Sequence, residues 1–456
     1  MLKKIYNFTI VILVFQMFVC EANSQIIPDE NILKTPILSF KGFLNSSFAV
    51  RNQNSSFEQK KLPDAFTDNR YNGRYGANNS SQFNLKAEAK TSLNVKYGIA
   101  ARLETEFFSD QNRGRVDIDQ AFIFANSSYG KFEFGNIVAV NQKMKVGPTS
   151  FAKGNGGING NYLKYVNLPM LNNSANNYNV KLPSFILVAQ SPIGHGGYAQ
   201  GFYNDNFNKN RIRTLRNGNF NGSEDAVKIN YYSPRIEGLQ IGASYTRDTS
   251  SSGVATTIFG NNSTTVNDVF SFGANYSGDI DNIGYAVSAT AENGTVKQYQ
   301  GSLDRNNLSS YDLATTISYF GFSLGASYGS WGNSLQTKNN QGIYSCDYNS
   351  GLALSSQNCS TNSQKFKNAS YYTLGAAYEF GPVGISLTNL KSTFQKNEYK
   401  AISLDIDYKL KRDLIPYFEI TKFEFKSNQV QAFDIFTNQL QDNKGFVALV
   451  GFLFSF

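Results

Sequence analysis

The sequence contains very little histidine, tryptophan, proline and cysteine. Its 456 residues include one His, one Trp, 10 Pro and 3 Cys. The single histidine, His195 in "SPIGHGGY", has no carboxylate or thiolate close to it in the sequence, so it offers neither a metal-ligand set nor a catalytic triad. We interpret His195 as a solvated loop residue, and we expect no enzymatic activity, no metal site and no cofactor.

Long apolar runs are also missing from the chain beyond its first residues. No later stretch approaches eighteen consecutive apolar residues, which excludes membrane-spanning helices. Near the start, two lysines precede an apolar core at 5–19 that is too short and too interrupted to span a bilayer. We interpret residues 1–24 as a signal peptide cleaved after Ser24 and residues 25–36 as a periplasmic N-terminal segment. Cleavage after Ala22 fits almost as well. Removal of residues 1–24 lowers the formal net charge from +8 to +7.

After this cleavage only Cys346 and Cys359 remain. Two cysteines in an exported chain are expected to form a disulfide, because the compartment is oxidising. This bond would close a loop. The alternative is a pair of free thiols.

Aromatic residues and glycine are abundant, and they occur in segments that alternate between apolar and polar positions. The chain has 37 Phe, 27 Tyr and 38 Gly, a composition that favours strands and tight turns. In "LQIGASYT" (239–246) every second residue is apolar, and "YKAISLDIDYKL" (399–410) sets Ile402, Leu404 and Ile406 against a polar face. Alternation with period two is typical of a half-buried strand. The polar faces carry mostly Gly, Ser, Ala and Thr, whereas a soluble sandwich would carry Lys, Glu and Thr there.

This alternation predicts a single all-β domain at 37–456, a 16-stranded antiparallel transmembrane β-barrel. The predicted strands are 37–50, 82–91, 98–108, 116–127, 130–137, 226–233, 238–248, 268–278, 283–293, 310–319, 322–331, 370–380, 384–395, 399–410, 415–426 and 445–456. Their apolar faces would meet lipid and their polar faces would line a lumen, and a barrel of about 16 strands leaves an aqueous channel.

Two further patterns agree with a membrane barrel. Short turns, such as 320–321 and 381–384, alternate with long Asn/Ser/Gly-rich stretches, such as 52–81 and 330–369, as periplasmic turns and external loops do. The chain also ends in "GFVALVGFLFSF", whose alternate residues are apolar up to the terminal Phe456. Lipid would cover that face.

Three stretches resemble the Gram-negative general porins. They are "VKINYYSPRIEGLQIGASYTRD" (227–248), "GKFEFGN" (130–136) and the C-terminal Phe456. The resemblance implies an outer-membrane homotrimer surrounded by lipid and lipopolysaccharide, through which small hydrophilic solutes and ions diffuse passively. It also implies a long third loop, about 138–225, folded into the lumen. The barrel-assembly machinery would recognise the terminal aromatic residues Phe452, Phe454 and Phe456. The second loop, about 109–115, is short for the intersubunit latch of this family.

The charges of the third loop depart from the acidic loop found in many of these porins. Residues 134–204 contain no Asp or Glu, whereas lysines recur there, and we take four of them as candidates for the constriction: Lys143, Lys145, Lys153 and Lys164. Strand register places a second set on the pore wall: Lys86, Glu88, Arg102, Glu104, Glu106, Asp117, Asp119 and Glu133. A basic loop facing an acidic wall would create a transverse field across the pore. We expect a weak preference for anions. The alternative is that the loop lysines are solvated surface charges.

Three other function classes stay open at this stage. A surface adhesin or antigen could use the barrel as a platform for its long loops. A barrel enzyme is disfavoured by the single histidine. A soluble β-sandwich would be monodisperse without detergent. No nucleic-acid partner is expected.

Overall fold

A computed structural model describes most of the barrel and parts of its connections. The described residues are 36–55, 74–107, 115–159, 162, 165–166, 170–173, 180–183, 226–249, 265–297, 306–334, 344–346, 359–361, 368–394, 397–411, 413–426, 432–433 and 442–456. The predicted signal peptide and all but the last residue of the predicted segment at 25–36 lie outside these residues.

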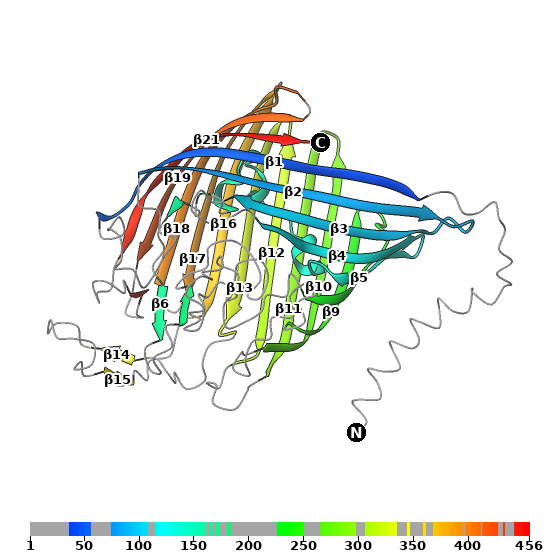
Figure 1. The fold of residues 1–456 in the computed structure, drawn as a ribbon, viewed down its shortest axis with the longest axis horizontal. Helices are drawn as coiled ribbons and strands as arrows, with labels where there is room; N and C mark the ends of the chain where they lie inside the picture. Colours follow the sequence, from blue (N-terminus) through cyan, green and yellow to red (C-terminus); the bar gives the residue numbers. More distant parts are fainter. Residues whose placement is uncertain are drawn as a thin grey trace.

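Sixteen antiparallel strands form a closed barrel (Figure 1). In order around the barrel they are β1 (Ile37–Asn52), β2 (Tyr75–Lys90), β3 (Lys96–Phe107), β4 (Arg115–Ser127), β5 (Gly130–Asn136), β8 (Val227–Tyr232), β9 (Leu239–Asp248), β10 (Thr265–Ile280), β11 (Ile283–Lys297), β12 (Leu308–Tyr319), β13 (Phe322–Gly332), β16 (Ala369–Phe380), β17 (Val383–Phe394), β18 (Asn397–Tyr408), β19 (Leu414–Lys426) and β21 (Asn443–Ser455). The predicted fold class is confirmed, and each predicted strand has a counterpart.

The start of β2 differs from the prediction. The sequence suggests a strand from residue 82, but β2 begins at Tyr75, and its Asn- and Ser-rich first half pairs with β1 through contacts such as Asn78 with Ser47. These residues have low strand propensity. The 16-residue β1 nevertheless supplies a complete row of hydrogen-bonding partners, and such tertiary pairing overrides propensity. The connection between β1 and β2 is therefore shorter than predicted, at 53–74.

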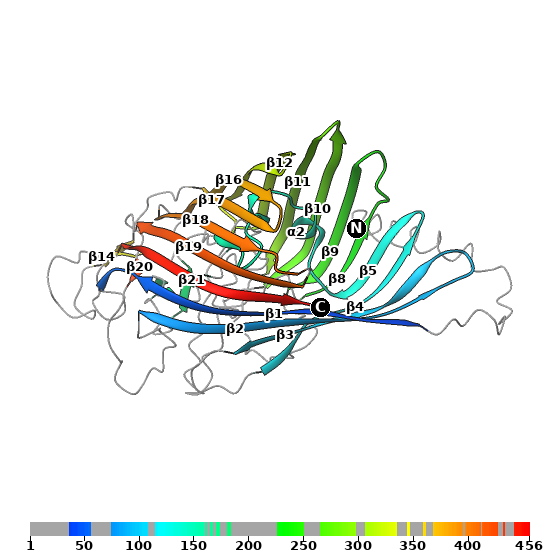
Figure 2. The same cartoon turned by 90° about the horizontal axis from the view of Figure 1, so that it is seen from above.

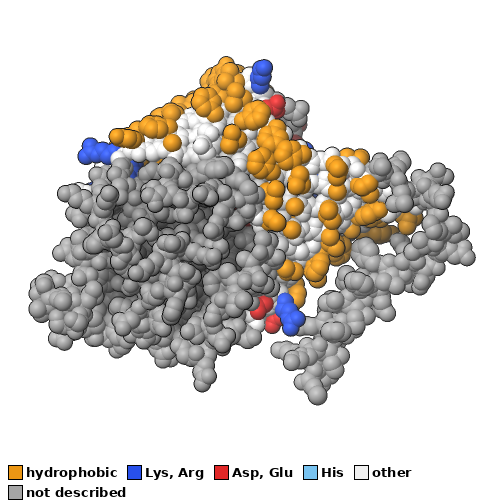
Figure 3. Space-filling model, viewed as in Figure 1, with side chains coloured by type: hydrophobic (Ala, Val, Ile, Leu, Met, Phe, Trp, Pro, Cys, Tyr) orange, Lys and Arg blue, Asp and Glu red, His pale blue; other side chains and the backbone are white. Residues whose placement is uncertain are grey.

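Apolar side chains cover the outside of the barrel. Along β16, for example, Tyr372 and Leu374 are exposed, whereas the residues that alternate with them, Tyr371 and Thr373, are buried on the inner side. The space-filling view shows bands of apolar side chains across the described strands (Figure 3). Exposed apolar surface of this extent requires a lipid covering. Within the described residues, no helix has both the length and the hydropathy to cross a bilayer.

The last residue of the chain takes part in closing the barrel. The backbone N–H of Phe456 donates to the carbonyl of Gly42 at 3.0 Å, and Gly42 returns a bond of the same length. The Phe456 ring lies 5.2 Å from the ring of Phe40 and 6.0 Å from that of Phe83. A Cβ at residue 42 would approach the Phe456 ring to 2.8 Å, so this contact requires glycine.

The two ends of the barrel have different connections. At one end every connection has two to six residues, and the hairpin at Phe320 and Gly321 adopts positive φ angles of 43° and 83°, as tight hairpin turns do. At the opposite end the connections have seven residues or more, except that only residues 395–396 join β17 to β18.

Candidate channel constriction

Residues 137–159, here called the inner segment, lie against the inward-facing side of the barrel wall. The segment contains α2 (Val140–Lys143), η2 (Pro148–Ser150) and η3 (Gly157–Asn159). Figure 2 shows α2 inside the ring of strands. The backbone N–H of Val140 donates to Ser244 Oγ at 2.9 Å, and that of Val146 donates to Ser288 Oγ at 3.1 Å. Both serines face inward and are buried, so this part of the inner segment contacts the inward face of the wall.

Small residues on the barrel wall make room for this segment. A Cβ at Gly242 or Gly273 would lie 2.7 or 2.9 Å from Met144 Sδ, and a Cβ at Gly375 would lie 2.5 Å from Pro148 Cβ. These distances are shorter than a van der Waals contact. The glycine-rich polar faces of the strands are thus explained by close approach of the inner segment.

Glu133 on β5 joins the inner segment to the wall. Lys143 Nζ lies 3.0 Å from Glu133 Oε2, Lys131 Nζ lies 2.6 Å from Oε1, and Asn230 Nδ2 donates to Oε2 at 3.1 Å. Lys143 Nζ also lies over the Phe122 ring, 5.5 Å from its centroid. Burial lowers the pKa of Lys143, and the Glu133 carboxylate opposes that shift. The buried Glu133 carboxylate therefore forms ion pairs with two lysines.

Two further basic side chains of the inward face lie on the neighbouring strands, Arg102 on β3 and Lys86 on β2. Arg102 Nη1 lies 3.5 Å from the buried Asp119 carboxylate. Lys86 pairs with Glu88, and its Nζ lies 4.8 Å from the centroid of the Phe124 ring. Two pairs of predicted wall residues thus contact each other on the inward face, Lys86 with Glu88 and Arg102 with Asp119.

Glu104, Glu106 and Asp117 lie nearer the long-loop end. In the ladder between β3 and β4, Glu104 is opposite Asp117, and Glu106 is opposite Arg115. A β-bulge lies next to Glu104 on β3, between Arg102 and Leu103. Register therefore brings these three predicted wall residues together.

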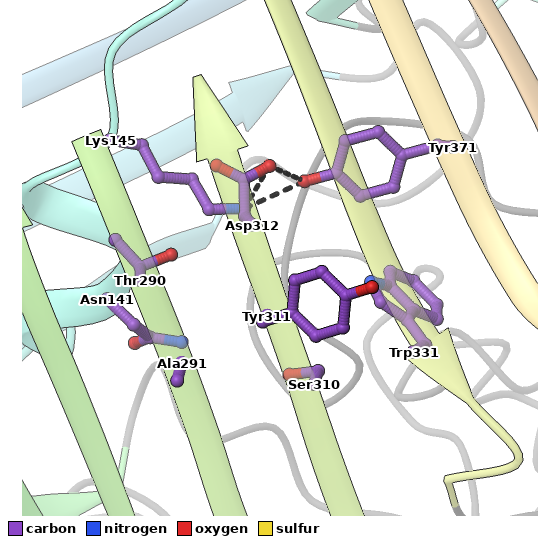
Figure 4. Close-up of a pocket in the computed structure, with 9 residues that line it drawn as sticks. All are labelled: Asn141, Lys145, Thr290, Ala291, Ser310, Tyr311, Asp312, Trp331 and Tyr371. Atoms are coloured by element: carbon purple, nitrogen blue, oxygen red, sulfur yellow. Dashed lines mark hydrogen bonds and ion pairs between the residues drawn. The ribbon is translucent and has the colours of Figure 1, made fainter. Parts of the chain in front are cut away.

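Lys145 lies in a small cavity between the inner segment and the wall (Figure 4). Its Nζ donates to the Tyr371 hydroxyl at 3.0 Å and lies 3.6 Å from Asp312 Oδ2. The Tyr371 hydroxyl in turn donates to Asp312. Figure 4 shows the three groups converging from the segment, β12 and β16. Lys145 thus acts as an anchor of the inner segment more than as an exposed pore charge.

The end of the inner segment is held by carboxylates of β18 and β19. The backbone N–H groups of Lys153 and Gly154 each donate to Asp407 at 2.9 Å. Glu419 accepts from the Gly157 N–H at 3.0 Å and from Asn155 Nδ2 at 3.4 Å. Two buried carboxylates therefore satisfy four donors of a segment that has little regular structure.

Lys153 extends from the same region to Glu379, which also accepts from Lys409 Nζ at 3.2 Å. Sequence reasoning missed Glu379, Asp312, Asp407 and Glu419 as partners of the loop. For Asp407 the signal was present, because it occupies the polar face of the alternating segment 399–410. Lys164 lies outside the described residues.

Cys346 and Cys359 lie directly opposite each other in a two-stranded antiparallel sheet, β14 (Tyr344–Cys346) and β15 (Cys359–Thr361). Opposite residues in such sheets have Cα atoms about 4.5–5.5 Å apart, within the range that a disulfide requires. We expect the mature protein to show no free thiol when it is denatured without reductant, and two after reduction. Labelling with a thiol-reactive reagent, read by intact mass, measures this. Two labels before reduction would contradict the bond.

A second small sheet contains β20 (Ala432–Phe433), β6 (Met170–Asn173) and β7 (Val180–Pro183), in that order. It joins the third loop to the connection between β19 and β21. Within the described residues, no group of three His, Cys, Asp or Glu side chains could hold a metal ion.

Comparison with known proteins agrees with this architecture. A family model described as Gram-negative porin matches residues 38–428. An uncharacterized protein of Rickettsia felis is 28% identical over 359 residues, which cover 68% of this chain and 70% of that protein. An uncharacterized protein of Rickettsia prowazekii is 28% identical over 360 residues with the same coverage.

Solved structures share the fold at low identity. The anion-selective porin from Comamonas acidovorans superposes with a TM-score of 0.50 and 14% identity, covering 92% of this chain and 100% of that one. A porin variant from Rhodopseudomonas blastica gives a TM-score of 0.49 and 12% identity with the same coverage.

Proposed function

Because this chain belongs to the Gram-negative porin family, we propose that it forms a water-filled outer-membrane channel through which small hydrophilic solutes diffuse passively, with a preference for anions. Porins are channels and carry out no covalent chemistry. The inner segment supplies the constriction, and its fixed charges sort the solutes.

The observation that supports anion preference is an asymmetry of exposure within the ion pairs of Glu133 and Asp119, which the Lys153–Glu379 pair does not share, since its side chains are 34% and 46% exposed. Around Glu133, Lys131 and Lys143 are 42% and 31% exposed, whereas the carboxylate side chain is 1% exposed. In the next pair Arg102 is 32% exposed and Asp119 1%. The bases face the lumen and the carboxylates lie behind them. A passing ion therefore experiences the field of the cations first.

The shared fold of the Comamonas porin does not carry this proposal, because 14% identity relates the folds alone. The proposal depends on the ion pairs of this chain.

Reconstitution into a planar bilayer tests both parts of the proposal. We expect discrete conductance steps and, under a KCl gradient, a reversal potential on the chloride side. A potassium-side reversal would contradict the anion preference, and a silent bilayer would contradict the open channel. Raising the KCl concentrations on both sides at a constant ratio, up to about 1 M, provides the control, since a preference that arises from fixed surface charge weakens as the Debye length falls to about 3 Å.

We propose several further properties on the basis of family membership. The chain is exported with cleavage after Ser24, assembles through the barrel-assembly machinery with Phe456 as signal, and forms a homotrimer among lipid and lipopolysaccharide. The short-turn end then faces the periplasm and the long-loop end faces outward.

A further inference from the structure

A row of lysines crosses the inward face of four neighbouring strands at the short-turn end of the barrel. Lys90 on β2 is the ladder partner of Lys96 on β3. Asn126 on β4 lies between Lys96 and Lys131 on β5 as the ladder partner of both. We call Lys90, Lys96 and Lys131 the lumenal lysine row. The four strands lie side by side in Figure 1, and with a spacing of about 4.8 Å between strands the row is about 14 Å long.

Ion pairs show that the row faces the lumen. Lys131 Nζ lies 2.6 Å from Glu133 Oε1, and the same carboxylate binds the inner segment. Lys96 Nζ lies 3.9 Å from Glu88 Oε1. Lys90 lies two residues after Glu88 on β2, so the two side chains share one face of the strand. Ladder partners point to the same side of a sheet, which agrees with this assignment.

The row leads from the mouth of the barrel to the inner segment. Lys90 ends β2 and Lys96 begins β3, so both lie at the rim beside the short turn at 91–95. At the other end of the row, Lys131 shares one carboxylate with Lys143 of the inner segment. A solute that follows the row therefore passes from the rim to the inner segment.

The positive charge of this wall exceeds its negative charge. Within the described strands β2 to β5, two carboxylates occupy inward positions between the row and Arg102, those of Glu88 and Glu133. Four lysines share them: Lys86, Lys96, Lys131 and Lys143. Lys90 has no ion-pair partner within 4.0 Å in the described part of the chain. The short turns that join β2 to β3 and β4 to β5 contain no charged residue, so three positive charges are left in excess.

The lysines of the row are more accessible than the carboxylates beside them. Lys96 and Lys131 are 52% and 42% exposed, whereas Glu88 and Glu133 are 24% and 1% exposed. Lys90 is exposed as well. It lies directly opposite Lys96, and like charges in such a pair repel. An anion from the solution that contacts several of these ammonium groups at once relieves the repulsion.

We propose that the lumenal lysine row binds a linear oligophosphate, a solute with several phosphate groups in one chain. Each lysine ammonium contacts a different phosphate group as a point charge. One orthophosphate reaches only part of a row of about 14 Å, whereas a chain of phosphates extends along it. Binding itself requires only this wall of the barrel. Its consequence for transport rests on the proposed channel function: the flux of such a solute saturates at concentrations that fill the row.

Isothermal titration calorimetry on the detergent-purified full chain tests the proposal. The titrations use low ionic strength, because salt screens exposed charges, and no divalent cations. The probes are orthophosphate, pyrophosphate, triphosphate and citrate, the last as a compact anion with three carboxylates. The test variant is K90Q/K96Q/K131Q. The control variant is K391Q/K400Q/K444Q, which removes the same charge from the outward faces of β17, β18 and β21.

We expect the affinity to rise from orthophosphate through pyrophosphate to triphosphate, and triphosphate to bind the control variant and the unchanged chain alike. The test variant should bind triphosphate on the order of 100-fold more weakly, about fivefold for each lysine. The single variant K90Q breaks no ion pair within the described residues. Its expected loss of about fivefold keeps the test valid if the triple variant does not fold.

Three results would overturn the proposal. Equal affinities for orthophosphate and triphosphate would show that the row does not recognise a chain of phosphates. Binding of citrate as strong as that of triphosphate would show that a compact anion suffices. Equal losses in the test and control variants would show unspecific attraction. Recording in a planar bilayer separates this proposal from the channel function: conductance without triphosphate binding contradicts the row alone, and triphosphate binding without conductance contradicts the channel alone.

Discussion

Replacing Lys131 and Lys143 together by glutamine is expected to remove most of the channel's anion preference. A unit charge about 7 Å from the path of an ion contributes about 0.6 kcal/mol in water, and 0.1 M salt reduces this by about half. Because the effects on anion and cation are opposite, each lost charge changes the permeability ratio of chloride to potassium by about threefold. The double replacement should therefore lower the ratio roughly eightfold to tenfold. The reversal potential under a KCl gradient measures it.

Glu133→Gln provides the matched opposite change, since it keeps both lysines and removes the carboxylate behind them. We expect this variant to raise the ratio of chloride to potassium about threefold. The triple variant, with Gln at 131, 133 and 143, avoids leaving a buried carboxylate without its cations and should still fall below the unchanged channel. If the double variant and Glu133→Gln shift the ratio in the same direction, the exposed bases do not set the selectivity.

Strand positions were predictable from the sequence because the lipid-facing side imposes strict alternation. In β18, Ile402, Leu404 and Ile406 could only face lipid, which fixed Asp405 and Asp407 inside. Both residues are buried against the inner segment. The direction of each side chain followed from period two, without knowledge of any neighbour.

The partners of the loop lysines were not predictable in the same way. Lys145 contacts Asp312 and Tyr371, which lie 167 and 226 residues further along the chain. No local sequence pattern predicts these contacts. The path of the inner segment depends on where glycines such as Gly273 leave space on several strands at once. Sequence alone therefore indicated an acidic wall on the first strands, whereas much of the contact lies on β12, β16, β18 and β19.

Double replacement of Asp407 and Glu419 by alanine is expected to release the inner segment from the wall. Four donors lose their acceptors: the backbone N–H groups of Lys153, Gly154 and Gly157, and the side-chain amide of Asn155. A buried donor without a partner costs about 1–3 kcal/mol, so the segment gains by moving into the water of the lumen. Single-channel recording should show a broad distribution of step sizes and added current noise.

Asp407→Asn with Glu419→Gln is the matched control, because each amide keeps one acceptor oxygen at nearly the same position. This control should retain narrower steps than the alanine variant. Gly154→Val is expected to displace the inner segment from the wall without a change in charge, because a Cβ at this residue would lie 2.2 Å from the Tyr417 ring. Broad steps in both the alanine and the valine variants, with the barrel's β-sheet circular dichroism retained, would identify the inner segment as the constriction. Unchanged steps in both would place the narrowest point elsewhere, because the two substitutions disturb the segment through unrelated contacts.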